Sequence, residues 1–90
     1  MSGAPTKMNS IINVGDVLVE KDDVNFGFVI LSHNLFTNGW GFRVIWFDDG
    51  VTGLLYENQL DSYLELGELV KLSEKEAFVT KIKYSENLTQ

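Results

Sequence analysis

Short apolar runs separated by turn residues fill the chain from Val14 to Leu66. Within these runs the residues are rich in Val, Ile, Leu and Phe, which is typical of β-strands packed on one or both faces. Runs of this length, spaced about ten residues apart, indicate a small antiparallel barrel or sandwich. The sequence therefore predicts a mainly β fold with five strands, at residues 17–21, 26–32, 40–47, 51–56 and 63–66.

Turn signals separate these predicted strands. Residues 33–39 are expected to form a connection, and the Asn38-Gly39 pair within it is a strong signal for a β-hairpin. Asp48-Asp49-Gly50 predicts a tight turn, because glycine accepts the positive φ that such turns often require. Residues 57–60 are expected to make one helical turn.

The last 23 residues, 68–90, allow two interpretations. Residues 68–72 and 77–84 alternate like strands. However, Ser73 and Glu76 fit a helical capping box, and Phe78 and Ile82 share one face of a helix. Acids precede lysines in this segment, as the helix dipole favours, so a short helix is the favoured prediction. We expect a loose N-terminal arm (1–12), a barrel (13–67) and a C-terminal extension packed on the barrel (68–90).

Strand alternation predicts two apolar faces on the sheet. It places Phe28 and Ile30 on one face and Val29 on the other. In the next strand Phe42 and Val44 share a face with Trp46, while Ile45 and Phe47 lie opposite. A second apolar face must be covered by the C-terminal extension, by the wall of a closed barrel or by another subunit.

Composition narrows the class of protein. The chain has 90 residues, one His, no Cys and a net charge of −6. One small domain is expected, without disulfides or thiolate zinc sites. No apolar run reaches the roughly 20 residues of a membrane helix, and no secretory leader is visible. We expect a cytoplasmic or virion protein that is not secreted and has no membrane partner.

The residues that carry enzyme chemistry are sparse. His33 has no Cys to pair with, and the G-x-S-x-G elbow of serine hydrolases does not occur. Glycine-rich phosphate loops are also missing. Asp23 and Asn25 begin like a calcium loop, but Phe26 follows where an oxygen ligand is needed. The sequence therefore predicts no enzyme, no cofactor, no metal site and no small-molecule substrate.

Two aromatic residues are candidates for a contact surface. Phe36 and Trp40 flank the predicted turn, and large aromatics beside a loop tip often mark a binding site. The favoured function is a non-enzymatic protein–protein interaction or structural assembly module that binds a protein partner or its own copies. The alternative is a nucleic-acid-binding small barrel, and a third hypothesis is an acidic mimic of nucleic acid. Nucleic-acid binding would use the basic residues Arg43, Lys71, Lys75, Lys81 and Lys83.

Net charge disfavours that alternative. Residues 1–67 carry nine acidic and three basic side chains, whereas residues 68–90 carry four of each. A nucleic-acid binder gains affinity by neutralising phosphates with Lys and Arg, and the predicted barrel would instead repel them.

One long segment resembles a known class of domain. Residues 44–60, VIWFDDGVTGLLYENQL, resemble the central stretch of Tudor-like small barrels, and VGDVLV at residues 14–19 resembles their opening strand. Small SH3-like barrel proteins of tailed phages have a similar Gly-Asp opening and a similar turn. The resemblance implies a five-stranded SH3-like barrel and a role in a phage particle or a similar assembly. Asp49 stands where a Tudor cage commonly has tyrosine, so no methyl-ligand site is carried over.

Overall fold

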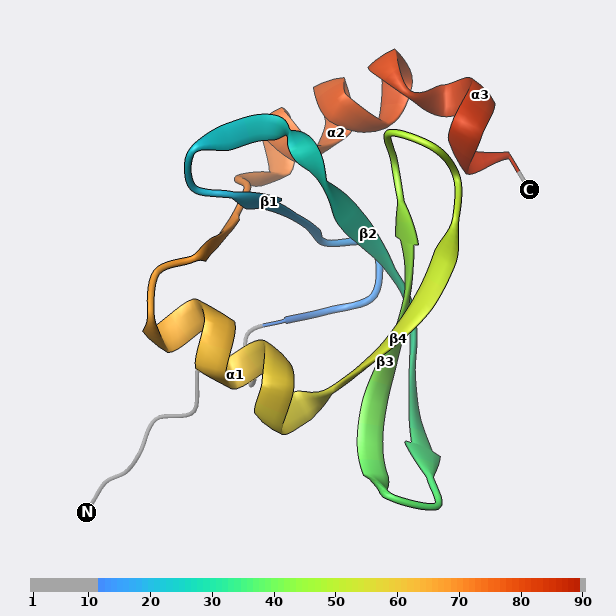
Figure 1. Cartoon of the computed structure of the whole chain (residues 1–90). Coiled ribbons are helices and arrows are strands. Elements are labelled where there is room, and N and C mark those ends of the chain that lie inside the picture. Colours follow the sequence, from blue (N-terminus) through green and yellow to red (C-terminus); the bar gives the residue numbers. More distant parts are fainter. Residues whose placement is uncertain (1–11, 90) are drawn as a thin grey trace.

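The structure, a computed structural model, describes residues 12–89 (Figure 1). This part of the chain contains five strands and three helices. In chain order these are β1 (Val17–Glu20), β2 (Asp23–Phe36), β3 (Gly39–Trp46), β4 (Thr52–Tyr56), α1 (Glu57–Glu65), β5 (Leu69–Lys71), α2 (Glu74–Lys83) and α3 (Ser85–Leu88).

All five strands belong to one antiparallel sheet, in the order β4-β3-β2-β1-β5. The prediction of a mainly β fold with five antiparallel strands is confirmed. The sheet is not closed, because β4 and β5 are its two edges. It also extends past the expected boundary at residue 67, since β5 pairs with β1 through Leu18 and Lys71.

The hairpin of β2 and β3 is longer than the sequence suggested. The turn is made by Thr37 and Asn38, with Gly39 following at a φ of 120°, so the predicted hairpin is present. The predicted connection over residues 33–39 is wrong, because β2 continues to Phe36. The pairing register with β3 shifts between Ile30 and Ser32, which forms a bulge. A bulge reverses the alternation of side chains between the two faces. Residues 32–36 therefore do not continue the period-two pattern of the residues before them, and the sequence pattern did not show that the strand goes on.

The segment after β4 is a helix rather than a turn and a strand. Residues 57–60 do begin helically, but α1 continues to Glu65, so the predicted strand over 63–66 is wrong. The Gln59 side chain accepts a hydrogen bond from the Tyr56 backbone amide at 3.0 Å and caps the helix start. Leu60 and Leu64, four residues apart, then both pack into the core, as one helix face does.

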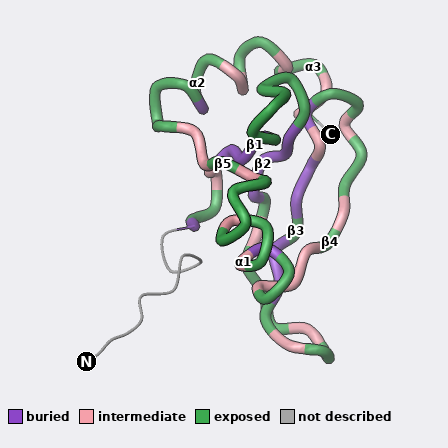
Figure 2. The backbone as a smooth tube through the Cα atoms, turned by 60° about the vertical axis from the view of Figure 1, so that its left-hand side comes forward, coloured by how far each residue is buried: buried purple, intermediate pink, exposed green. Residues whose placement is uncertain are grey.

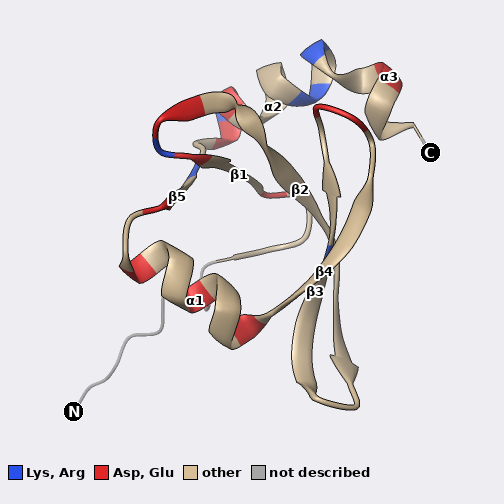
Figure 3. Ribbon diagram, in the orientation of Figure 1, with Lys and Arg blue, Asp and Glu red and all other residues tan. Residues whose placement is uncertain are grey.

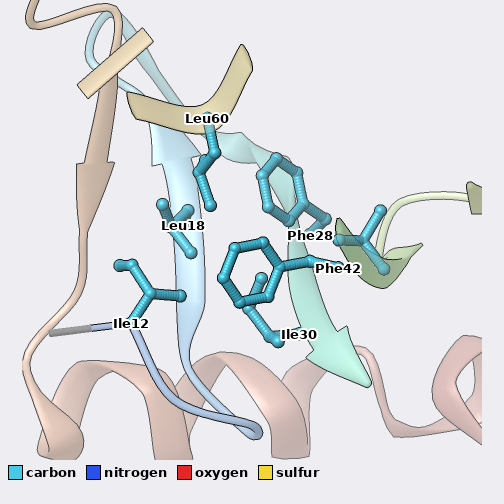
Figure 4. Packing of buried hydrophobic residues seen from close by; sticks show 7 residues of the cluster. Ile12, Leu18, Phe28, Ile30, Phe42 and Leu60 are labelled. Carbon is cyan, nitrogen blue, oxygen red and sulfur yellow. The ribbon is translucent and has the colours of Figure 1, made fainter. Parts of the chain in front are cut away.

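One hydrophobic core lies between the sheet and α1. It contains Ile12, Leu18, Phe28, Ile30, Phe42, Val44 and Leu60 (Figure 4). Trp46 packs against this cluster from the same face of β3. The alternation predicted for β2 and β3 is confirmed here. The predicted arm over residues 1–12 lies outside the described residues, apart from Ile12, which is buried in this core.

The second core lies on the other face of the sheet, under the C-terminal helices. It contains Val17, Val19, Val29, Ile45, Phe47 and Ala77, with Leu72, Tyr84 and Leu88 packed against them. Burial is concentrated along β1, β2 and β3, and the helices expose most of their surface (Figure 2). Of the three covers expected for this face, the C-terminal extension is therefore the one that the structure shows.

Hydrogen bonds between neighbouring residues define the start of α2, as the sequence predicted. The Ser73 hydroxyl accepts a hydrogen bond from the Glu76 amide, and the Glu76 carboxylate accepts one from the Ser73 amide. The predicted capping box and helix are confirmed. Asn87 then donates to the Phe47 carbonyl at 2.9 Å, which holds α3 on the end of the sheet.

Candidate functional site

The tip of the β2–β3 hairpin projects beyond the rest of the sheet (Figure 1). β4 pairs with residues 41–45 of β3, whereas the β2–β3 pairing continues through Leu35–Trp40 to Phe36–Gly39. The last pairs therefore extend past the neighbouring strand. Two-stranded projections of this kind place their side chains within reach of another molecule.

Leu35 and Trp40 form the exposed surface at this tip, which we call the tip surface. They are direct cross-strand partners, so their side chains lie on the same face of the hairpin. The exposed fractions are 65% for Leu35 and 49% for Trp40. Two adjacent, large and apolar side chains thus remain in water in the isolated chain.

A histidine braces Trp40 from the same face. The His33 ring lies 5.0 Å from the Trp40 ring and stacks on Phe42 with 4.4 Å between ring centres. Its Nε2 atom is hydrogen-bonded to Glu57 at the start of α1. Because Phe42 is fully buried, this stack joins the exposed tip surface to the first core. The indole of Trp40 is therefore held in place before any partner binds.

Phe36, the second sequence candidate, lies on the opposite face of the hairpin. It is paired with Gly39, one position from the Leu35–Trp40 pair, and neighbouring strand residues point to opposite faces. Its ring meets Tyr56 edge-on at 6.3 Å and lies under the guanidinium of Arg43 at 5.7 Å. The structure therefore does not bring Phe36 and Trp40 together.

Sequence reasoning missed three members of this site. Leu35 was assigned to a loop, so its pairing with Trp40 could not be seen. His33 and Glu57 are 24 residues apart in the chain, and no local signal links them. The position of Trp40 beside the turn was the one useful indicator.

The basic candidates are spread over separate elements (Figure 3). Arg43 is in β3 and packs over Phe36. Lys71, in β5, forms an ion pair with Asp16 at 3.3 Å. Lys75, Lys81 and Lys83 are on α2, and Lys83 donates to the Asn25 side chain at 3.3 Å. These residues do not gather around the tip surface.

Acidic residues line α1 and the cavity beside it. Glu57, Asp61 and Glu65 recur every four residues along α1, which places them on one side of that helix (Figure 3). A cavity of about 500 Å³ on the same side of the sheet as α1 is bordered by Glu20, Asp22 and Glu68, together with Lys21. This arrangement disfavours a phosphate backbone on the α1 side of the molecule.

Three aspartates at or beside turns accept hydrogen bonds from nearby backbone amides. Asp23 and Asp49 each accept a hydrogen bond from the amide two residues later, at 3.0 Å. Asp16 accepts one from the Asn13 amide at 2.7 Å. Within residues 12–89, no three His, Cys, Asp or Glu side chains gather as a metal site would require. These carboxylates therefore have local structural roles.

Comparison with known proteins gave no relatives: no family model, curated protein or solved structure matches the chain. Among the described residues, the helices are all too short or too polar to cross a membrane.

Proposed function

We propose that this chain is a non-enzymatic protein-interaction module that presents its tip surface to a protein partner. The fold we propose is an SH3-like, Tudor-like small barrel whose sheet remains open. Its setting is an assembly such as a phage particle, in the virion or in the cytoplasm of the host. No cofactor or small-molecule substrate takes part in this function.

The exposed Leu35–Trp40 pair carries this proposal. Tryptophan is the side chain most enriched among residues that dominate binding energy at protein interfaces. Trp40 is half exposed and already fixed by His33, so binding would cost little conformational entropy. The acidic side of α1 begins at Glu57, which contacts His33. A partner with an apolar centre and a basic rim fits this arrangement.

The replacement Trp40→Ala tests the proposal. We expect it to weaken partner binding by roughly 30-fold, the equivalent of the ~2 kcal/mol typical of a dominant interface residue. The fold should persist because Trp40 lies at the exposed tip. Binding is measured by capturing partners on the immobilised full chain, and folding by amide NMR.

A matched control is Leu66→Ala, which removes an apolar side chain that is 68% exposed at the end of α1. This variant should capture the partner as the parent does. Equal capture by Trp40→Ala and the parent would contradict the proposal.

Nucleic-acid binding, the alternative function, has a separate test. Amide NMR spectra are recorded at low salt while a mixture of single-stranded oligonucleotides is added. We expect no shifts, because Lys71 is paired with Asp16 and Arg43 packs on Phe36. Shifts at Arg43 and the α2 lysines that salt reverses would favour the alternative, since phosphate contacts weaken steeply with salt.

A further inference from the structure

Helix α2 has a large apolar surface on the side that faces away from the sheet. Phe78, Val79 and Ile82 are exposed by 65%, 57% and 58%, and we call them the α2 ridge. Ala77, on the inner side, is the residue of α2 that is buried in the second core. A helix that covers a sheet normally has its apolar residues inward and polar residues outward. The α2 ridge is not needed to hold α2 on the sheet.

Charges flank this ridge in a self-complementary order, and one further lysine, Lys75, lies on the ridge itself, one turn before Phe78 and Val79. Glu74 and Lys81 are seven residues apart, which is two helical turns, and both line the groove that also contains Phe78. The acid is at the N-terminal end of α2 and the lysine is at the C-terminal end. Glu76 and Lys83 repeat this order on the other flank, where Glu76 bonds Ser73 and Lys83 bonds Asn25.

We propose that the α2 ridge binds the same ridge of a second copy, with the two helices antiparallel about a two-fold axis. A two-fold axis brings one patch against itself, so Phe78 lies near its counterpart at the centre and Ile82 lies about one helical turn to the side. The same axis places Glu74 of each chain opposite Lys81 of the other. A parallel pair would instead place acid against acid and lysine against lysine.

Apolar burial provides the affinity of this dimer, and the charges choose its orientation. Exposed ion pairs add little to stability, but like charges in contact are unfavourable. The tip surface and α2 lie at opposite ends of the molecule (Figures 1 and 2). The dimer would therefore leave both tip surfaces free, so it extends the proposed function without depending on it.

The first test measures association of the full chain by sedimentation. Concentrations run from about 10 µM to about 1 mM, because a contact made by one short helix per chain is small and should be weak. The parent should form dimers, and Phe78→Ser should raise the dissociation constant by at least about tenfold. Leu35→Ser is the matched control, since Leu35 and Phe78 are both 65% exposed.

The control separates this inference from the proposed function. Leu35→Ser should dimerise like the parent although it alters the tip surface. If Leu35→Ser abolished dimerisation and Phe78→Ser did not, the copies would meet through their hairpins and the inference would be wrong. A parent chain that stays monomeric at all concentrations would also overturn it, even if Trp40→Ala weakened capture of a partner.

The second test addresses orientation. Glu74→Lys and Lys81→Glu should each weaken dimerisation, because like charges then face each other across the two-fold axis. Mixing the two variants should restore dimers as mixed pairs, since every facing charge is then opposite. Mixed pairs no stronger than either variant alone would exclude the antiparallel arrangement. Glu65→Lys, on α1, is the control for the change in net charge and should leave association unchanged.

Discussion

Replacing Gly27 with alanine is expected to destabilise the protein by at least about 3 kcal/mol. Gly27 is buried in β2 opposite Val19, where the register between β1 and β2 shifts. A Cβ atom added to Gly27 would lie 2.1 Å from the carbonyl oxygen of Leu18 and 2.8 Å from the Cα atom of Val19. Both contacts are with backbone, so neither can be relieved by a change of rotamer.

The displacement of β1 caused by this substitution would disturb both cores. β1 supplies Leu18 to the first core and Val17 and Val19 to the second, so moving β1 away from Gly27 opens both. A domain of this size has a free energy of unfolding of roughly 5–10 kcal/mol, so the variant would lose a large part of it. Urea unfolding followed by tryptophan fluorescence measures the loss.

Gly53→Ala is the matched control for this prediction. A Cβ atom at Gly53 would meet the Trp46 indole nitrogen at 3.7 Å and Val44 at 3.9 Å, which are ordinary contacts. Its free energy of unfolding should stay within about 1 kcal/mol of the parent, since alanine is close to glycine in an unstrained strand position. Equal stability of the two variants would show that β1 does not approach Gly27 as closely as the structure has it.

Replacing Phe47 with alanine is expected to cost about 3–5 kcal/mol of the free energy of unfolding. Phe47 is fully buried and belongs to the second core. Its ring packs on Tyr84 with 4.7 Å between ring centres, and its carbonyl accepts a hydrogen bond from Asn87. The cavity left by the substitution would loosen α2 and α3 together, because residues of both helices pack in the core that Phe47 fills.

Phe78→Ala provides the comparison, because it removes the same atoms from a ring that is 65% exposed. At a concentration low enough to keep the chain monomeric, this variant should lose less than about 0.5 kcal/mol. Hydrogen exchange at the amides of α2 and α3 should quicken in Phe47→Ala and remain unchanged in Phe78→Ala. If both variants lost the same stability, the C-terminal helices would not cover the sheet as described.

The centre of the sheet could be predicted because β1, β3, β4 and the first part of β2 each carry a local signal. The alternation of Phe28, Val29 and Ile30 matches their division between two cores. The helix of the C-terminal extension was predictable from Ser73 and Glu76, whose capping box is a short-range hydrogen-bond pattern. These features depend on residues within four positions of one another.

The candidate site was less predictable because its geometry depends on register. Trp40 could be selected for its place beside a turn, but the bulge between Ile30 and Ser32 decided which residues share its face. Because of that bulge, Leu35 and His33 lie on the same face of the hairpin as Trp40, and Phe36 lies on the opposite face. A bulge shifts the pairing between two strands by one residue, and no residue type in β2 indicates where the shift occurs.

The sequence by itself determined the central parts of the first four strands, the two apolar faces, the hairpin turn and the capped helix near the C-terminus, because each is encoded by contacts between near neighbours. Only the tertiary structure decided that the helix begun at residues 57–60 continues to Glu65, since Leu60 and Leu64 then enter the core together. It also decided that the C-terminal extension covers the second face while the α2 ridge stays in water. In each case the deciding contacts join residues far apart in the chain, and local propensity does not encode such contacts.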